Sequence, residues 1–101
     1  MRDNDASLSA AVVIWTGWRE SAWPDRDDAR VVRRFGAAAA TTLLPQIRQL
    51  ADDFYASDAR DKAADLREMG ERAMARFRAR HPEISDEAVH ALAWCYTYDY
   101  K

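Results

Sequence analysis

The chain has 101 residues, 49% of them hydrophobic, and a formal net charge of −2 at neutral pH. This length suits one domain with a single core, and the hydrophobic share excludes a disordered chain. Only three glycines and three prolines occur, which argues against an all-β domain rich in hairpins, and the net charge gives no general attraction to nucleic acid or to an anionic membrane.

The first predicted helix covers residues 8–22, where apolar side chains recur at the spacing of one helix face. Ser7 directly precedes this stretch and is expected to cap its N-terminus. Trp23 and Pro24 end the helix, because the residue before a proline avoids helical backbone angles.

The next two helices are predicted over residues 25–44 and 46–56. Asp25 is the expected N-cap of the first of them. Pro45 lacks a backbone donor, so it either kinks one long helix or separates two helices. The pattern leaves both alternatives open.

A longer helix is predicted over residues 58–80, with Ser57 at its start. His81 and Pro82 close it. Its inward face is expected to consist of six residues at helical spacing: Ala59, Ala63, Leu66, Met69, Ala73 and Phe77.

The last helix, over residues 86–99, has the clearest start signal in the chain. Ser85 is its expected N-cap. Ile84 before the cap and Val89 after it have the spacing of a hydrophobic staple.

The connections between these helices are short, which favours antiparallel neighbours. We therefore predict an all-α fold, in which residues 1–101 form a single domain built as a compact up-down bundle of four to five helices. No internal repeat, linker or low-complexity tract divides the sequence.

The sequence has no signature of catalysis, metal binding or cofactor binding. Glu87 and His90 have the Glu-x-x-His spacing of di-iron bundles, but such a site needs two of these pairs and two further glutamates, and the chain has only five glutamates. Cys95 lies among aromatic residues and far from a helix N-terminus, where the pKa of a thiol rises. Because no glycine-rich phosphate loop is present either, we expect no enzyme, no metal and no cofactor.

The cellular compartment is inferred from the cysteine content and from the first residues. A single cysteine excludes an internal disulfide, so nothing indicates an oxidising compartment. The longest apolar run near the N-terminus, Ala10–Trp15, is shorter than a signal peptide or a membrane helix requires. We therefore expect a cytoplasmic protein without a membrane partner. Its basic residues are mostly arginine, which is typical of GC-rich bacterial genomes.

Three arginines, Arg26, Arg30 and Arg33, are predicted to share one helix face. Such a face can bind phosphates, which makes a nucleic-acid-binding regulator the alternative function. Nearby aspartates offset much of this charge, and intrahelical ion pairs on a solvated face explain the same pattern.

Acidic residues line a second outer face at Asp58, Asp61 and Asp65, and Arg72 and Arg76 follow on the same face. Acids at the start of a helix and bases at its end are what the helix dipole favours, so this pattern has a structural explanation. The acidic half also offers a negative patch that would steer a basic partner.

The aromatic C-terminal helix is the least ordinary feature of the sequence. Tyr96 and Tyr100 are predicted to point inward, whereas Trp94 and Tyr98, four residues apart, point the other way. Exposed Trp and Tyr side chains often dominate the binding energy of protein interfaces. The alternative is that both residues belong to the core, and the sequence leaves this open.

These features favour a small cytoplasmic protein-binding module, of the kind expected of a bacterial immunity, antitoxin or accessory protein. Trp94, Tyr98 and the acidic patch at Asp58, Asp61 and Asp65 form its expected binding surface. The net charge disfavours nucleic acid as the partner, and a homo-oligomer is compatible with the sequence.

Overall fold

A computed structural model describes residues 2–101, with side chains from Asp5 onward. Helices contain 74% of the chain, and residues 2–101 include no strand, which confirms the predicted all-α fold. The helical segments are α1 (Arg2–Thr16), α2 (Asp28–Phe35), α3 (Ala37–Tyr55), α4 (Ala59–Lys62), α5 (Leu66–Arg80) and α6 (Asp86–Asp99). Of these, α4 is a single turn.

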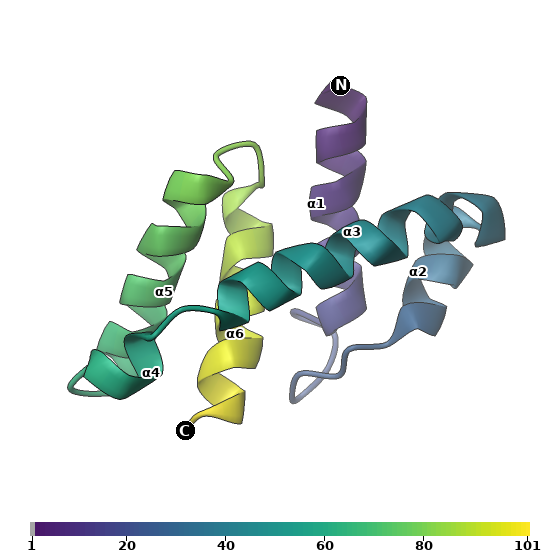
Figure 1. Cartoon of the computed structure of the whole chain (residues 1–101). Helices are drawn as coiled ribbons and strands as arrows, with labels where there is room; N and C mark the ends of the chain where they lie inside the picture. The colour runs from purple at the N-terminus through teal and green to yellow at the C-terminus, as the bar shows by residue number, and fades with distance from the viewer. Residues whose placement is uncertain (1) are drawn as a thin grey trace.

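The helices pack around α6, the last of them. Figure 1 shows α5 and α6 side by side as an antiparallel pair, with α1 beside α6 on its other side and running in the same direction. The long helix α3 crosses in front of α1 and α6, and α2 packs against α1 and α3. The first and last helices of the described chain are therefore in direct contact.

The centre of the core is an aromatic cluster to which α3, α5 and α6 each contribute one fully buried ring. The ring of Phe54 lies 5.2 Å from that of Phe77 and 5.6 Å from that of Tyr96, measured between centroids. Burying three rings of this size supplies a large share of the hydrophobic stabilisation. The largest aliphatic side chains that are fully buried in the core are Ile47, Leu92, Val12, Val31 and Val89.

The first helix differs from the prediction at both ends. Ser7 lies inside α1 and does not cap it, and α1 ends at Thr16 rather than at residue 22. Gly17, with φ +78°, leaves the helix in a conformation that favours glycine. The following loop then turns back, and the backbone N–H groups of Asp25 and Asp27 donate to the carbonyls at the end of α1 over 3.1 and 3.0 Å. These hydrogen bonds satisfy carbonyls that a longer helix would have satisfied itself.

The second helix starts later and ends earlier than predicted. Asp27, not Asp25, is the N-cap, and its carboxylate accepts from the N–H of Ala29 over 2.9 Å. Gly36 adopts φ 90° and ψ 157°, a conformation almost restricted to glycine, and separates α2 from α3.

Pro45 neither ends nor divides the helix that contains it, because α3 continues through this residue to Tyr55. A proline within a helix removes one hydrogen bond to the carbonyl four residues earlier, which here belongs to Thr41. Both residues are exposed, so water can satisfy that carbonyl. Of the two alternatives at Pro45, the separation into two helices is therefore wrong, and the break lies at Gly36.

The predicted helix over residues 58–80 is interrupted at residues 63–65. Ser57 does precede a helical turn, and its hydroxyl accepts from the N–H of Ala59 over 3.2 Å. A second cap follows, because Asp65 accepts from the N–H of Glu68 over 2.8 Å while the Glu68 carboxylate accepts from the N–H of Ala64 over 3.2 Å. This reciprocal pair resembles a capping box and starts α5 at Leu66.

The last predicted helix is confirmed with its bounds, since α6 covers residues 86–99. The Ser85 hydroxyl accepts from the N–H of Ala88 over 3.2 Å, as expected of an N-cap. Ile84 and Val89 are both buried in the core, where the predicted staple places them.

Candidate functional site

The structure separates the aromatic residues of α6 into two faces. Tyr96 is fully buried, whereas Tyr98 is 41% exposed. Trp94 is half-buried, and its ring packs edge-on against that of Trp18 at a centroid distance of 5.4 Å. Tyr100 lies past the end of α6 and is exposed, so the prediction that it points into the core is wrong.

Trp94 and Tyr98 line an open groove of about 610 Å³, which we call the α5–α6 groove. Leu66, predicted to face the core, lies at one end of α5 and is 46% exposed in this groove. The complete lining consists of Trp18, Leu66, Arg67, Gly70, Glu71, Met74, His90, Ala93, Trp94, Thr97, Tyr98 and Lys101.

Gly70 determines the shape of the α5–α6 groove. It is buried, and a Cβ atom added to it would lie 3.3 Å from Cγ2 of Thr97 on α6. The two helices therefore approach closely at this point and form the floor of the groove. Leu66 and Met74 lie four residues to either side of Gly70, on the same face of α5, and also line the groove.

Trp18 reaches the α5–α6 groove from the loop that follows α1. Its indole Nε1 is buried and has no hydrogen-bond partner among the described residues. The indole of Trp15, by contrast, donates to the carboxylate of Asp28 over 2.9 Å. Buried indole N–H groups usually find an acceptor, so the unpaired donor of Trp18 is an exception at the edge of the groove.

Charged groups lie at the rim of the α5–α6 groove. The guanidinium of Arg67 is 3.5 Å from the carboxylate of Glu71, and both side chains are exposed. The ammonium of Lys101 lies 4.1 Å from the ring centroid of Tyr98, at the same end of the groove as Leu66. The rim is therefore polar around an apolar floor, which is the usual organisation of a protein interface.

The acidic residues predicted to share an outer face fall on two elements, because the helix is interrupted between them. Asp58 and Asp61 are exposed at α4, and Asp58 pairs with Lys62 over 3.0 Å. Asp65 caps α5, so part of its charge serves the helix N-terminus. Of the two arginines expected to follow on this face, Arg76 instead turns toward α3 and donates to the backbone carbonyl of Asp53 over 2.7 Å.

The three arginines proposed for nucleic acid do not share a helix face, because Arg26 precedes α2. Arg26 donates to the Tyr55 hydroxyl and to the Asp99 carboxylate, over 2.8 Å in each case. Although burial opposes it, this pairing and the Tyr55 hydrogen bond lower the pKa of Asp99. Burial, reinforced by the hydrogen bond to Asp99, raises the pKa of Tyr55.

The other two of these arginines differ in their surroundings. Arg30 donates to the carbonyl of Asp25 over 2.7 Å and to the Ser21 hydroxyl over 2.8 Å. Arg33 is exposed on α2. Two of the three candidate guanidinium groups are thus already bound within the chain.

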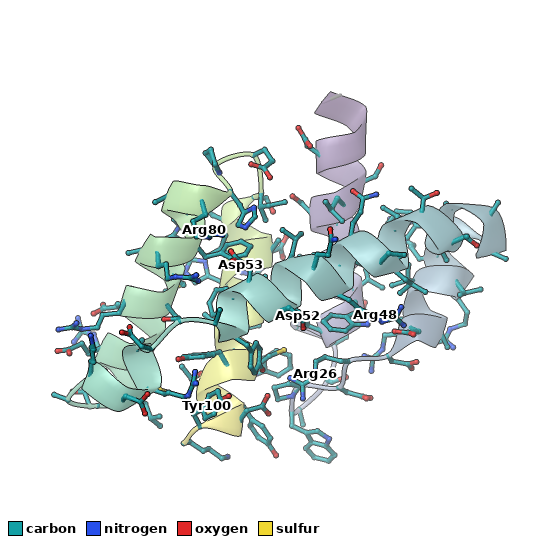
Figure 2. All side chains as sticks on the ribbon, in the orientation of Figure 1. Arg26, Arg48, Asp52, Asp53, Arg80 and Tyr100 are labelled. Carbon is teal, nitrogen blue, oxygen red and sulfur yellow. The ribbon has the colours of Figure 1, made fainter. Side chains whose placement is uncertain are left out.

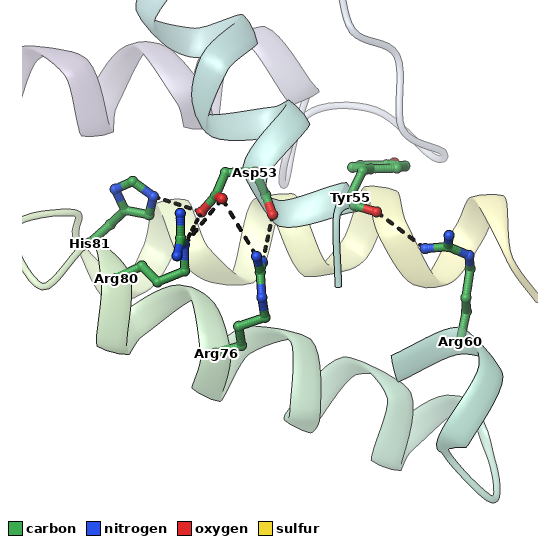
Figure 3. Close-up of polar contacts among 6 residues, drawn as sticks. All are labelled: Asp53, Tyr55, Arg60, Arg76, Arg80 and His81. Carbon is green, nitrogen blue, oxygen red and sulfur yellow. Dashed lines mark hydrogen bonds and ion pairs between the residues drawn. The ribbon is translucent and has the colours of Figure 1, made fainter. Parts of the chain in front are cut away.

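One polar cluster was not anticipated from the sequence, and Figures 2 and 3 show it between α3 and the end of α5. The Asp53 carboxylate accepts from Nε of Arg80 over 2.9 and 3.1 Å and lies 2.8 Å from Nε2 of His81. The hydrogen bond from Arg80 lowers the pKa of Asp53. All partners lie more than twenty residues away in sequence, so no local pattern could have indicated the cluster. It joins α3 to the end of α5.

The residues considered for metal binding and nucleophilic chemistry have other contacts. The carboxylate of Glu87 lies 3.9 Å from the guanidinium of Arg19. Nδ1 of His90 is hydrogen-bonded to the backbone carbonyl of Asp86 over 2.8 Å. In the described part of the chain, no group of three His, Cys, Asp or Glu side chains could hold a metal ion. Burial raises the pKa of the Cys95 thiol to about 12, the direction expected from the sequence.

The α5–α6 groove is therefore the surface on which the predicted binding residues Trp94 and Tyr98 meet.

No described helix is both long enough and apolar enough to cross a bilayer. Comparison of the chain with protein families, with curated proteins and with solved structures finds no match.

Proposed function

We propose that this chain is a protein-binding module whose α5–α6 groove receives an amphipathic helix of a partner protein. The observation that carries the proposal is an open apolar groove in which Trp94, Tyr98 and Leu66 are brought together. Tryptophan and tyrosine are enriched among the residues that dominate interface energies. An apolar groove between helices is also a recurring site for a partner helix.

The groove has the dimensions of a short helix. Leu66, Gly70 and Met74 follow one another by about one turn along α5, which corresponds to a length of roughly 12 Å. A partner helix of two to three turns spans this distance, with apolar residues spaced three or four apart along its inner face. Because the floor at Gly70 carries no side chain, the partner helix can approach α5 and α6 closely.

Trp18 adds apolar surface to this arrangement. Its ring packs edge-on against that of Trp94, and both side chains line the groove. The partner that we propose is thus an amphipathic helix whose apolar face packs on these side chains.

Within this class, we propose the mode of action of an immunity or antitoxin-type protein, which covers a basic site on its partner. Asp65 directly precedes Leu66, which is exposed in the groove, and Asp58 and Asp61 lie in the segment before it. Charges at the edge of an interface mainly steer association and select partners. The nucleic-acid alternative has less support, since Arg26 and Arg30 already bind groups within the chain.

The test starts with the tagged chain as bait and mass spectrometry to identify the partner. The dissociation constant of the purified pair is then measured for the wild type and for Trp94→Ala and Tyr98→Ala. We expect each change to weaken binding about tenfold or more. Val32→Ala is the matched control, because Val32 is an exposed apolar residue on α2 outside the groove, and its effect should stay within about twofold.

Circular dichroism of each variant establishes that loss of binding is not loss of folding. A partner that binds Tyr98→Ala and Trp94→Ala as tightly as the wild type would show that the groove is not the docking site. Nucleic acid that remains bound at moderate salt and is released by Arg33→Ala would support the alternative instead.

A further inference from the structure

A second groove, of about 580 Å³, lies along the outer side of α1 and shares no lining residue with the α5–α6 groove. We call it the α1 groove. Its apolar floor consists of Ala6, Ala10, Val13 and Ile14. In Figure 1, the N-terminal half of α1 extends beyond the other helices.

Described residues cover the outer face of α1 only in part: Ala6, Ser7 and Ala10 are exposed, and Val13 and Ile14 are half-buried. From Ala6 to Thr16 the helix contains no charged residue. Its opposite face is buried in the core through Leu8, Ala11, Val12 and Trp15. A helix at the surface of a domain normally carries charged and polar residues on its outer face, and a helix that is apolar all round is normally buried. The outer face of α1 therefore has the composition of an interface.

The rim of the α1 groove is acidic. Asp5 lies at one end, and Glu83 and Glu87 reach it from the connection between α5 and α6 and from the start of α6. No lysine or arginine is among its described lining residues. Arg19 lies 3.9 Å from Glu87, and the imidazole of His81, which is cationic only when protonated, lies 3.7 Å from Glu83. An apolar floor with a negative rim is complementary to an apolar surface with positive edges.

We propose that the α1 groove binds a basic amphipathic helix of a partner protein. The partner places its apolar stripe on the floor of the groove and its lysine or arginine side chains next to the three carboxylates. Ala6 and Ala10 are small, so the axes of the two helices can approach closely at this point. This inference does not depend on the α5–α6 groove, and it gives the molecule two separate docking surfaces.

The test uses a synthetic peptide of about 14 residues, with leucines spaced three and four apart and lysines elsewhere. A scrambled peptide of the same composition, without an apolar stripe, is the matched probe. Both are titrated into the isotope-labelled full chain and followed by NMR. We expect shifts in α1 and near Glu83 and Glu87, with the amphipathic peptide binding about tenfold more tightly than the scrambled one. Raising salt from about 50 to about 300 mM should weaken binding several-fold.

Three variants locate the peptide. Ala10→Arg places bulk and a positive charge in the groove and should weaken binding about tenfold or more. Ala38→Arg is the matched control on the exposed start of α3, and its effect should stay within about twofold. Glu83→Gln should weaken binding about threefold and reduce the dependence on salt.

Three outcomes would overturn the proposal. Equal binding of the scrambled peptide would show attraction by charge alone. Equal effects of Ala10→Arg and Ala38→Arg, or shifts confined to the α5–α6 groove, would place the peptide elsewhere. Self-association of the chain that Ala10→Arg abolishes, measured by analytical ultracentrifugation, would show that a second copy occupies the α1 groove instead.

Discussion

Replacing Asp53 with asparagine keeps the size of the side chain and removes the charge on which the cluster between α3 and α5 depends. The two oxygens of the carboxylate share the Nε–H of Arg80 in a bifurcated hydrogen bond, at 2.9 and 3.1 Å, and one of them lies 2.8 Å from Nε2 of His81. Hydrogen bonds to charged groups contribute about 1.5–3 kcal/mol. Because the Arg80 side chain is 54% exposed, water screens much of this contribution, and we expect a total loss of about 1–2 kcal/mol. That loss lowers the melting temperature by roughly 5–10 °C in a domain of this size.

The effect of Asp53→Asn should depend on pH. The hydrogen bond from Arg80 lowers the pKa of Asp53 in the folded chain, so the folded state binds this proton less tightly than the unfolded state. The stabilisation is therefore complete only well above the ordinary aspartate pKa of about 3.9. It is lost as the pH falls from about 5 through the folded-state pKa. Asparagine does not titrate, so the difference between wild type and variant should shrink in acid.

The assay is urea unfolding followed by circular dichroism, at neutral pH and at about pH 3.5. Asp52→Asn is the matched control, because Asp52 is the adjacent carboxylate on α3, is exposed and makes no ion pair among the described residues (Figure 2). Its free energy of unfolding should stay within about 0.5 kcal/mol of the wild type. Equal losses for Asp52→Asn and Asp53→Asn, or a loss that persists undiminished in acid, would refute this reasoning.

Four further predictions concern single residues. Trp18→Phe removes a buried donor that has no acceptor, so the melting temperature should stay the same or rise, corresponding to at most about 1 kcal/mol; a marked fall would contradict this. Because burial raises the pKa of Cys95 to about 12, a thiol reagent at mildly alkaline pH should react slowly with the folded chain and rapidly in urea. Gly36→Ala should cost about 1–3 kcal/mol in urea unfolding because of its positive φ. Gly70→Ala should be nearly neutral, since its helical gain is offset by the contact with Thr97.

Helix boundaries could be predicted where all their signals are local. At Ser85 the cap and the flanking apolar residues agree, and α6 begins and ends as expected. At Asp65 the Asp-x-x-Glu pattern is equally local, but it lies inside a stretch of continuous helical spacing, which predicts an uninterrupted helix. Pro45 and Gly36 illustrate competing signals. Proline is tolerated on the exposed face of α3, whereas the glycine conformation that divides α2 from α3 depends on how those helices pack.

The α5–α6 groove could be predicted only in part. The four-residue spacing of Trp94 and Tyr98 indicated a common face of α6, and this face does border the groove. Trp18 and Leu66 come from a loop and from another helix, and no spacing in the sequence relates them to Tyr98. Their meeting depends on the packing of α5 against α6 and on the end of α1 at Gly17. Local residue patterns therefore cannot predict such long-range contacts, even where they predict the individual helix faces.

The pairing of α1 with α6 has a consequence for synthesis on the ribosome. α1 is made first, yet the buried faces of Leu8 and Val12 belong to a core that α6 completes. α2 and α3 also contact α1, but the nascent chain leaves the part of this stripe that packs on α6 uncovered until almost all described residues have been translated. Folding cannot be completed one helix at a time, and the unfinished chain is the species most exposed to aggregation or to chaperones.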